Sequence, residues 1–169
     1  MLQAANKIKK ISLYQCNLIF KKAYWLLLFG AIALGNISSV LAQNNNVAIS
    51  QNNINPPLTV RGISGGKIKA KEAVQTDNTS TGYCDGYVSS QPNHIFQIDT
   101  FFEYLRLEIE SPADTTILVK GAGGVWCNDD AGSANPMIEG QWQPGTYQVW
   151  VGSYQADSNN NYEIKITGK

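Results

Sequence analysis

The side chains that could carry catalysis are few, and the most obvious catalytic pattern is incomplete. Ser64 lies in the stretch Gly62-Ile-Ser-Gly-Gly66, which is similar to a serine-protease nucleophile motif with Ile63 in place of Asp. A catalytic triad needs a base bonded to the serine and an acid that orients the base. The only histidine, His94, follows Ser64, which reverses the order of trypsin-like proteases. We therefore expect no catalytic residue, with Ser64 in a glycine-rich turn and His94 in an exposed turn.

A second group of side chains carries oxygen atoms that could bind a cation. Calcium takes six to eight oxygen ligands from carboxylates, amides and carbonyls. The same side chains also cap turns by bonding to backbone amides, and the EF-hand spacing is absent. Calcium therefore stays an open prediction, and we expect no other cofactor. The candidate metal ligands are Asp85, Asn128, Asp129, Asp130 and Asn135.

Aromatic and polar side chains form a third candidate site. A flat ring can stack on a sugar while neighbouring amides bond to its hydroxyl groups. The alternative is structural, with Trp126 and Trp142 packed at the edge of a sandwich and the other rings covered by cross-strand neighbours. The predicted ligand-binding residues, on strand faces opposite the apolar residues, are Tyr104, Arg106, Gln148 and Trp150.

The first 42 residues predict a secretory signal peptide. They hold five lysines and no acid, and an apolar run from Ala23 to Leu34 is followed by a small residue, Ala42. The run is shorter than the roughly 20 residues that cross a bilayer. This favours cleavage after Ala42, although an uncleaved single-span anchor is the alternative. We expect a secreted or periplasmic protein with no membrane contact after cleavage.

Removal of this leader would leave two cysteines, Cys84 and Cys127. In an oxidising compartment, two cysteines favour one intramolecular disulfide. Such a bond would stabilise the fold by roughly 3 to 4 kcal/mol. Two buried free thiols or a soft-metal pair are the alternatives, but zinc prefers four closely spaced ligands.

The remaining sequence divides into an amide-rich tract and a β-rich domain. Residues 43–57 lack apolar periodicity and predict a flexible linker. Residues 58–169 alternate apolar and polar side chains, which predicts an all-β antiparallel sandwich of the jelly-roll type. Residues 67–74 fit either a helical turn or a strand. The predicted strands are 58–64, 86–89, 94–99, 103–110, 115–120, 145–152 and 162–167.

Several stretches together resemble a known bacterial family. They are 84–88, 102–109, 114–119, 126–130 with Asn135-Pro136, and 142–153 with its Pro-Gly-Thr-Tyr turn. Over about residues 81–167, and more loosely 58–74, the chain is similar to the pre-peptidase C-terminal domain, most of all to small exported cyanobacterial versions. The resemblance implies a β-sandwich appended to secreted proteases, usually non-catalytic and sometimes assisting secretion or binding a substrate polymer.

The balance of charged residues limits the classes of partner that we expect. The chain has 13 basic and 13 acidic residues, and nucleic-acid binding normally requires a clustered basic face. We expect no nucleic-acid partner. The leading hypothesis is a non-enzymatic module that acts in binding, stability or secretion, with an extracellular or periplasmic protein or polysaccharide as partner. A carbohydrate-binding module, with or without calcium, is the alternative, and a small hydrolase is disfavoured because no complete catalytic constellation occurs.

Overall fold

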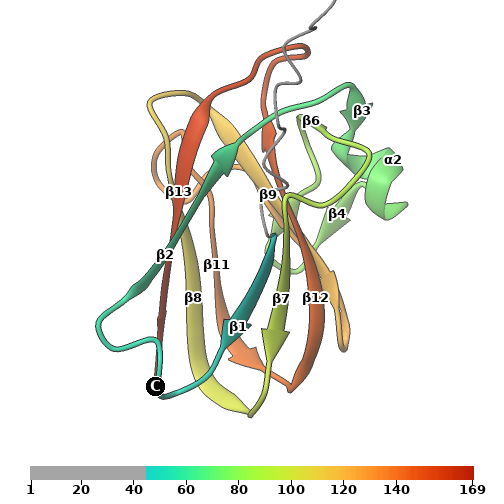
Figure 1. The fold of residues 1–169 in the computed structure, drawn as a ribbon. Coiled ribbons are helices and arrows are strands. Elements are labelled where there is room, and N and C mark those ends of the chain that lie inside the picture. Colours follow the sequence, from blue (N-terminus) through green and yellow to red (C-terminus); the bar gives the residue numbers. More distant parts are fainter. Residues whose placement is uncertain (1–44) are drawn as a thin grey trace, which may run out of the picture. The chain divides into compact units, whose positions relative to one another are not determined.

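Two stacked β-sheets form the core of the computed structural model, which describes residues 45–169 (Figure 1). The predicted signal peptide, residues 1–42, lies outside the described residues. Within residues 45–169, no helix is long and apolar enough to cross a membrane.

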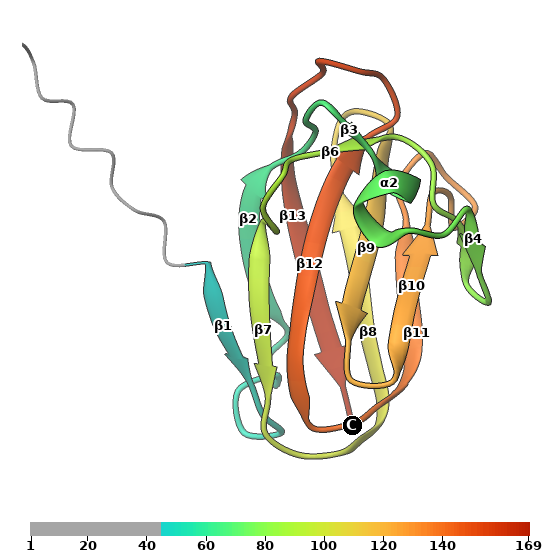
Figure 2. The ribbon, with the colours of Figure 1, turned by 90° about the vertical axis from the view of Figure 1, so that its right-hand side faces the viewer.

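The first sheet, sheet A, contains five strands in a row along one face of the sandwich (Figure 2). In spatial order they are β1 (Asn46–Ile49), β7 (His94–Ile98), β12 (Gly145–Ser153), β9 (Thr115–Gly121) and β10 (Gly124–Asn128). At the end of β12 the sheet continues through β6 (Tyr87–Val88) to β3 (Ile68–Lys69). All pairings are antiparallel except that of β1 with β7.

The second sheet, sheet B, lies behind the first in Figure 2. Its order is β2 (Leu58–Ile63), β13 (Asn161–Gly168), β8 (Phe102–Glu110) and β11 (Met137–Trp142). A separate hairpin and one short helix complete the domain: β4 (Asn78–Thr79), β5 (Gly82–Tyr83) and α2 (Ala70–Val74).

The strand order confirms the predicted jelly roll. The eight main strands are, in chain order, β2 and β7 to β13. In sheet B the first strand, β2, pairs with the eighth, β13, which pairs with the third, β8, and β8 pairs with the sixth, β11. In sheet A the second strand, β7, pairs with the seventh, β12, which pairs with the fourth, β9, and β9 pairs with the fifth, β10. Consecutive strands therefore alternate between the two sheets, except that β9 and β10 are neighbours in sheet A, as in the two Greek keys of a jelly roll.

Period-two patterning explains the core. Alternate residues of a strand point to opposite faces, so the apolar set of each strand faces the other sheet. In β8 these residues are Leu105, Leu107 and Ile109, and in β13 they include Ile164 and Ile166, all buried. The predicted inward faces of both strands are thus confirmed.

The outer face of sheet A carries a second, smaller cluster. Leu118 and Trp150 point outward from β9 and β12 but are buried beneath α2 and the Cys84–Cys127 disulfide. The disulfide predicted from the sequence is present. Residues 67–74 form a short strand followed by a helical turn, so both expectations for this stretch are met in part.

The prediction of a flexible linker over residues 43–57 is wrong for its described part. Residues 46–49 form β1, which pairs in parallel with β7, and Ile49 is fully buried. Ile54 lies in the turn region that follows β1 and is 5% exposed. A few apolar side chains among many amides give no clear periodic signal, yet Ile49 and Ile54 each fill a place in the core.

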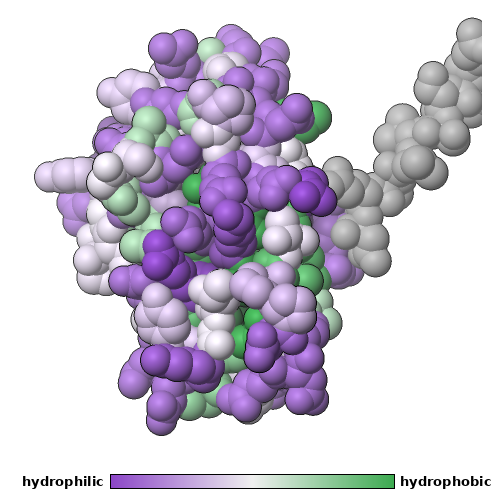
Figure 3. Space-filling view, turned by 90° about the vertical axis from the view of Figure 1, so that its left-hand side faces the viewer, coloured by the Kyte–Doolittle hydropathy of each residue, from purple (hydrophilic) through white to green (hydrophobic). Residues whose placement is uncertain are grey.

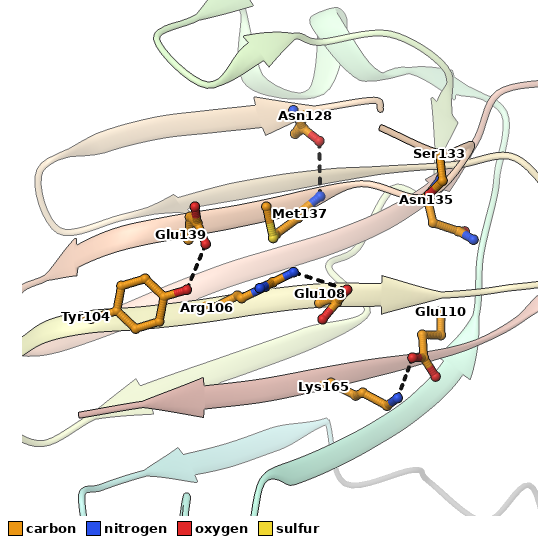
Figure 4. A network of polar contacts seen from close by, with 10 residues as sticks. All are labelled: Tyr104, Arg106, Glu108, Glu110, Asn128, Ser133, Asn135, Met137, Glu139 and Lys165. Atoms are coloured by element: carbon orange, nitrogen blue, oxygen red, sulfur yellow. Dashed lines mark hydrogen bonds and ion pairs between the residues drawn. The ribbon is translucent and has the colours of Figure 1, made fainter. Parts of the chain in front are cut away.

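The outer face of sheet B is polar, as Figure 3 shows for most of that side of the molecule. Its charged side chains pair with one another. Arg61 pairs with Glu163 at 2.6 Å. Figure 4 shows the pairs of Arg106 with Glu108, at 3.2 Å, and of Lys165 with Glu110. These pairs are largely solvent-exposed, so each adds little to stability. The face presents balanced charge rather than a patch of one sign.

Candidate functional site

A cleft lies at one side edge of the sandwich, where β10 of sheet A meets β11 of sheet B. Its volume is about 300 Å³. We call it the edge cleft. Aromatic, amide and hydroxyl side chains line it: Ser80, Thr81, Ala122, Gly123, Trp126, Ile138, Glu139, Gly140, Gln141, Trp142, Gln143 and Tyr147.

Three aromatic rings form the inner wall of the edge cleft. Trp126 and Trp142 stack with centroids 6.1 Å apart and planes inclined by 28°, and Tyr147 lies 5.0 Å from Trp142. The indole N–H of Trp142 donates to the Leu105 carbonyl at 3.1 Å, and the Tyr147 hydroxyl donates to the Gln143 carbonyl at 2.8 Å. Trp142 and Tyr147 are buried, whereas Trp126 is only half-buried. Trp126 is therefore the ring that a ligand can reach.

The cleft exists because one inward position has no side chain. Gly140 lies between Ile138 and Trp142 on β11, and a Cβ atom there would meet no atom within 4 Å. Its φ of +148° is a conformation that side-chain-bearing residues rarely adopt. The pairing of β11 with β8 also shifts between Gly140 and Trp142. Such irregularities bend a strand and occur often beside binding sites.

The β4–β5 hairpin forms one wall of the edge cleft and is hydrogen-bonded to β10. The Thr79 hydroxyl accepts a hydrogen bond from the Cys127 N–H at 3.0 Å, and the Thr81 hydroxyl donates to the Cys127 carbonyl at 2.8 Å. The side-chain amide of Asn128 donates to the Thr81 carbonyl at 2.9 Å. Cys84 directly follows the hairpin and bonds to Cys127. The disulfide thus fixes the wall that carries Ser80 and Thr81.

The predicted ligand-binding residues are not brought together by the fold. Tyr104 and Arg106 lie on the outer face of sheet B, where the Tyr104 hydroxyl donates to Glu139 at 2.7 Å (Figure 4). Gln148 is exposed on sheet A, on the other side of the sandwich. Trp150 is only 6% exposed, so its place in an exposed binding face is wrong. The alternation of residues along β12 correctly predicts that Trp150 points outward from the sandwich. It does not predict the helix that covers this side chain.

Two of the predicted metal ligands hold the backbone in place. The Asn128 side-chain oxygen accepts from the Met137 N–H at 3.0 Å (Figure 4). The Asn135 oxygen accepts from the Thr115 hydroxyl at 3.0 Å, and its amide donates to the Ser111 carbonyl at 3.0 Å. Through these contacts the two asparagine side chains stabilise turns, as the alternative to calcium binding predicts. Among residues 45–169, no group of three or more His, Cys, Asp or Glu side chains is arranged to hold a metal ion.

Burial and neighbouring acidic residues raise the proton affinity of Asp129. Burial, and then the charges of Asp130, Asp114 and Asp85, raise the pKa of Asp129 to about 6. One Asp129 carboxylate oxygen is buried without a hydrogen-bond partner. The calcium prediction for Asp85, Asp129 and Asp130 is not tested by this geometry and stays a prediction.

The protease-like motif proves to be a packing motif. A Cβ at Gly62 would lie 2.4 Å from the Tyr162 hydroxyl. The Ser64 hydroxyl is buried and forms a hydrogen bond with Ser153 at 2.9 Å. His94 is 3% exposed rather than in an exposed turn, and its Nε2 is bonded to the Tyr162 hydroxyl at 2.9 Å. Ser64 and His94 are thus each bonded to another side chain.

The strands that form the edge cleft, β10 and β11, were not among the strands predicted from the sequence. Glycines at 123, 124 and 140 interrupt both segments and weaken the strand pattern. A signal was nevertheless present, because Ile138, Gly140 and Trp142 alternate with Glu139 and Gln141. Read as one short strand, this alternation places a glycine between two apolar inward residues.

Comparison with known proteins gives distant similarities. No family model matches the chain. An uncharacterized protein of Synechococcus elongatus is 29% identical over 133 residues, covering 76% of this chain and 87% of that protein. The fold is similar to the pre-peptidase C-terminal domain of a collagenase from Bacillus anthracis, with TM-score 0.43, 10% identity, and coverage of 73% and 93% of the two chains.

A surface-associated copper-binding protein of Methylomicrobium album BG8 is also similar in fold. Its TM-score is 0.39 with 10% identity, covering 73% of this chain and 98% of that one. At these identities and TM-scores, neither likeness carries a function or a binding site over to this chain.

Proposed function

We propose that this chain is an exported, non-catalytic β-sandwich module that binds a protein or polysaccharide outside the cytoplasm through the edge cleft. One observation carries the proposal: the half-buried Trp126 ring borders a space that Gly140 leaves unfilled. A concave space bordered by an accessible aromatic ring and a few polar side chains is the kind of site that ligands occupy.

Export is part of the proposal and is supported by two features. The leader-like first 42 residues precede the domain, and the domain contains a disulfide. Disulfides persist in secreted and periplasmic proteins and are rare in the cytosol of most organisms. Cell fractionation combined with thiol labelling of the native protein tests this part. Recovery of the protein in the cytoplasm with both thiols free would contradict it.

The binding role is tested by capture from culture medium or periplasmic extract with the full chain as bait. We expect Trp126→Ala to lose the captured partner. Tyr154→Ala is the matched control, because Tyr154 is 51% exposed and does not line the cleft. Equal capture by wild type and Trp126→Ala would show that binding does not use the cleft.

The non-catalytic part has its own test. The Ser64 hydroxyl and the His94 ring are both buried and bonded to other side chains. We expect no hydrolysis of peptides or esters by the purified chain. Hydrolysis that disappears in Ser64→Ala would overturn this part of the proposal.

A further inference from the structure

We infer that the occupant of the edge cleft is a neutral saccharide, such as an end or a short segment of a glycan chain. This inference rests on the proposed binding function and adds the chemistry of the ligand to it. It follows from the charge, the accessible aromatic ring and the hydrogen-bonding groups of the cleft.

The charge of the cleft disfavours an anionic ligand. Glu139 is the one ionisable acid in its lining, and none of the described lining residues is Lys, Arg or His. A phosphate, a sulfate or a uronic acid would therefore find no cation among these lining residues. Binding sites for such groups use basic side chains or clusters of backbone N–H groups.

The exposed part of Trp126 provides a flat apolar surface. Trp142 stacks on Trp126 and is itself held by a hydrogen bond to Leu105, so the Trp126 ring is supported in one orientation. The face of an aromatic ring carries partial negative charge. The C–H groups on one face of a pyranose are apolar and slightly positive, so a sugar ring can stack there.

The polar side chains around Trp126 suit hydroxyl groups. Gln141 and Gln143 are exposed at the rim, and Ser80 and Thr81 stand on the hairpin wall. Amides and hydroxyls each donate and accept hydrogen bonds, as sugar hydroxyls do. An entirely apolar ligand would make no use of these polar groups. The volume of about 300 Å³ lies at the lower end for ligand pockets, which fits one or two sugar rings better than a folded partner.

The test is a titration of the disulfide-bonded full chain with three probes: neutral gluco- and manno-oligosaccharides, an oligomer of uronic acids, and a proline-rich peptide. Calorimetry and tryptophan fluorescence report binding. We expect a neutral oligosaccharide to bind, and Trp126→Ala to weaken its affinity by about tenfold or more. Trp126→Phe, which keeps a flat ring, should restore part of the affinity.

A matched pair of glutamine variants separates loss of the site from loss of the fold. Gln143→Ala removes a rim amide and should weaken saccharide binding severalfold, while the backbone carbonyl that holds Tyr147 is retained. Gln148 is also exposed but lies outside the cleft, so Gln148→Ala should leave the affinity unchanged.

Two outcomes would overturn the inference, and they differ in what else they overturn. Binding of the uronic acids or the proline-rich peptide alone, abolished by Trp126→Ala, would refute the neutral saccharide but keep the cleft as a binding site. Aromatic grooves do accept proline-rich peptides. If no probe binds and partner capture is insensitive to Trp126→Ala, both the inference and the proposed function fail.

Discussion

The two side edges of the sandwich are closed in different ways. At the edge formed by β1 and β7 facing β2, which we call the sealed edge, the N-terminal strand adds to the sheet and Ile49 fills the core (Figure 1). At the opposite edge, between β10 and β11, the edge cleft stays open and is lined by three aromatic rings and Gly140. The fold can therefore close an edge of the sandwich with aliphatic side chains. The edge between β10 and β11 is open because of the residues that line it.

Loss of the disulfide should have the largest effect and should act mainly on the open edge. The bond joins residues 43 positions apart and fixes the hairpin wall to β10. Removing a cross-link over a loop of this length costs about 4 kcal/mol in the chain-entropy model. We expect the double variant Cys84→Ser and Cys127→Ser to show this loss in urea denaturation. Saccharide affinity should fall as well, because the wall is no longer held. An unchanged unfolding midpoint would contradict this role.

Truncation of a core residue should distinguish the two edges directly. Ile49→Ala at the sealed edge would leave a cavity in a dry core, which costs about 2–4 kcal/mol. Trp126→Ala at the open edge should cost about 1 kcal/mol, because water can enter the enlarged cleft and the ring is half-exposed. Urea denaturation measures both. A larger loss for Trp126→Ala would mean that Trp126 mainly serves packing.

Acid should weaken the sealed edge through His94. Burial lowers the pKa of His94 from 6.5 to about 4. Below pH 6.5 the unfolded chain therefore binds a proton that the folded chain does not, so stability present above pH 6.5 is lost as the pH falls toward 4. The loss should reach roughly 2–3 kcal/mol.

A pair of variants identifies His94 as the source of this loss. His94→Gln should abolish the acid-dependent part of the unfolding free energy between pH 6.5 and 4. Tyr162→Phe should retain it, because burial rather than the hydrogen bond lowers the pKa. Loss of the pH dependence in Tyr162→Phe would show that the hydrogen bond is the cause.

Asp129, at the end of the open-edge strand β10, should respond to pH in the opposite direction and more weakly. Its folded pKa of about 6 lies above the ordinary 3.8, so the folded chain binds the extra proton. The resulting destabilisation is absent below pH 3.8 and complete above pH 6. Asp129→Asn should therefore stabilise the protein at pH 7, by at most about 1 kcal/mol because the side chain is partly exposed.

The same variant tests the calcium prediction. Asp99→Asn, an exposed acid outside this loop, is the control and should not change stability. A melting midpoint that rises with calcium in the wild type and not in Asp129→Asn would support a calcium site, since a ligand of the folded state raises the midpoint. An unchanged midpoint in excess chelator would remove calcium from consideration.

The sequence by itself determined the fold class and the covalent link. Strict alternation in Leu105, Leu107 and Ile109 fixed which face of β8 turns inward, because side chains of a strand point alternately to its two sides. Two cysteines follow the predicted leader and allow one pairing, and Cys84 and Cys127 form it. Both results depend only on local pattern or on counting.

Tertiary structure alone decided what covers each face and where an edge stays open. Trp150 points outward as its position predicts, but α2 buries it, and β1 joins the core through a partner almost fifty residues away in sequence, Ile49 opposite Ile98. The edge cleft needs Trp126 from one sheet and Gly140 and Trp142 from the other. Alternation specifies a direction for each side chain, whereas its neighbours across the sandwich are set by long-range pairing, which no local pattern encodes.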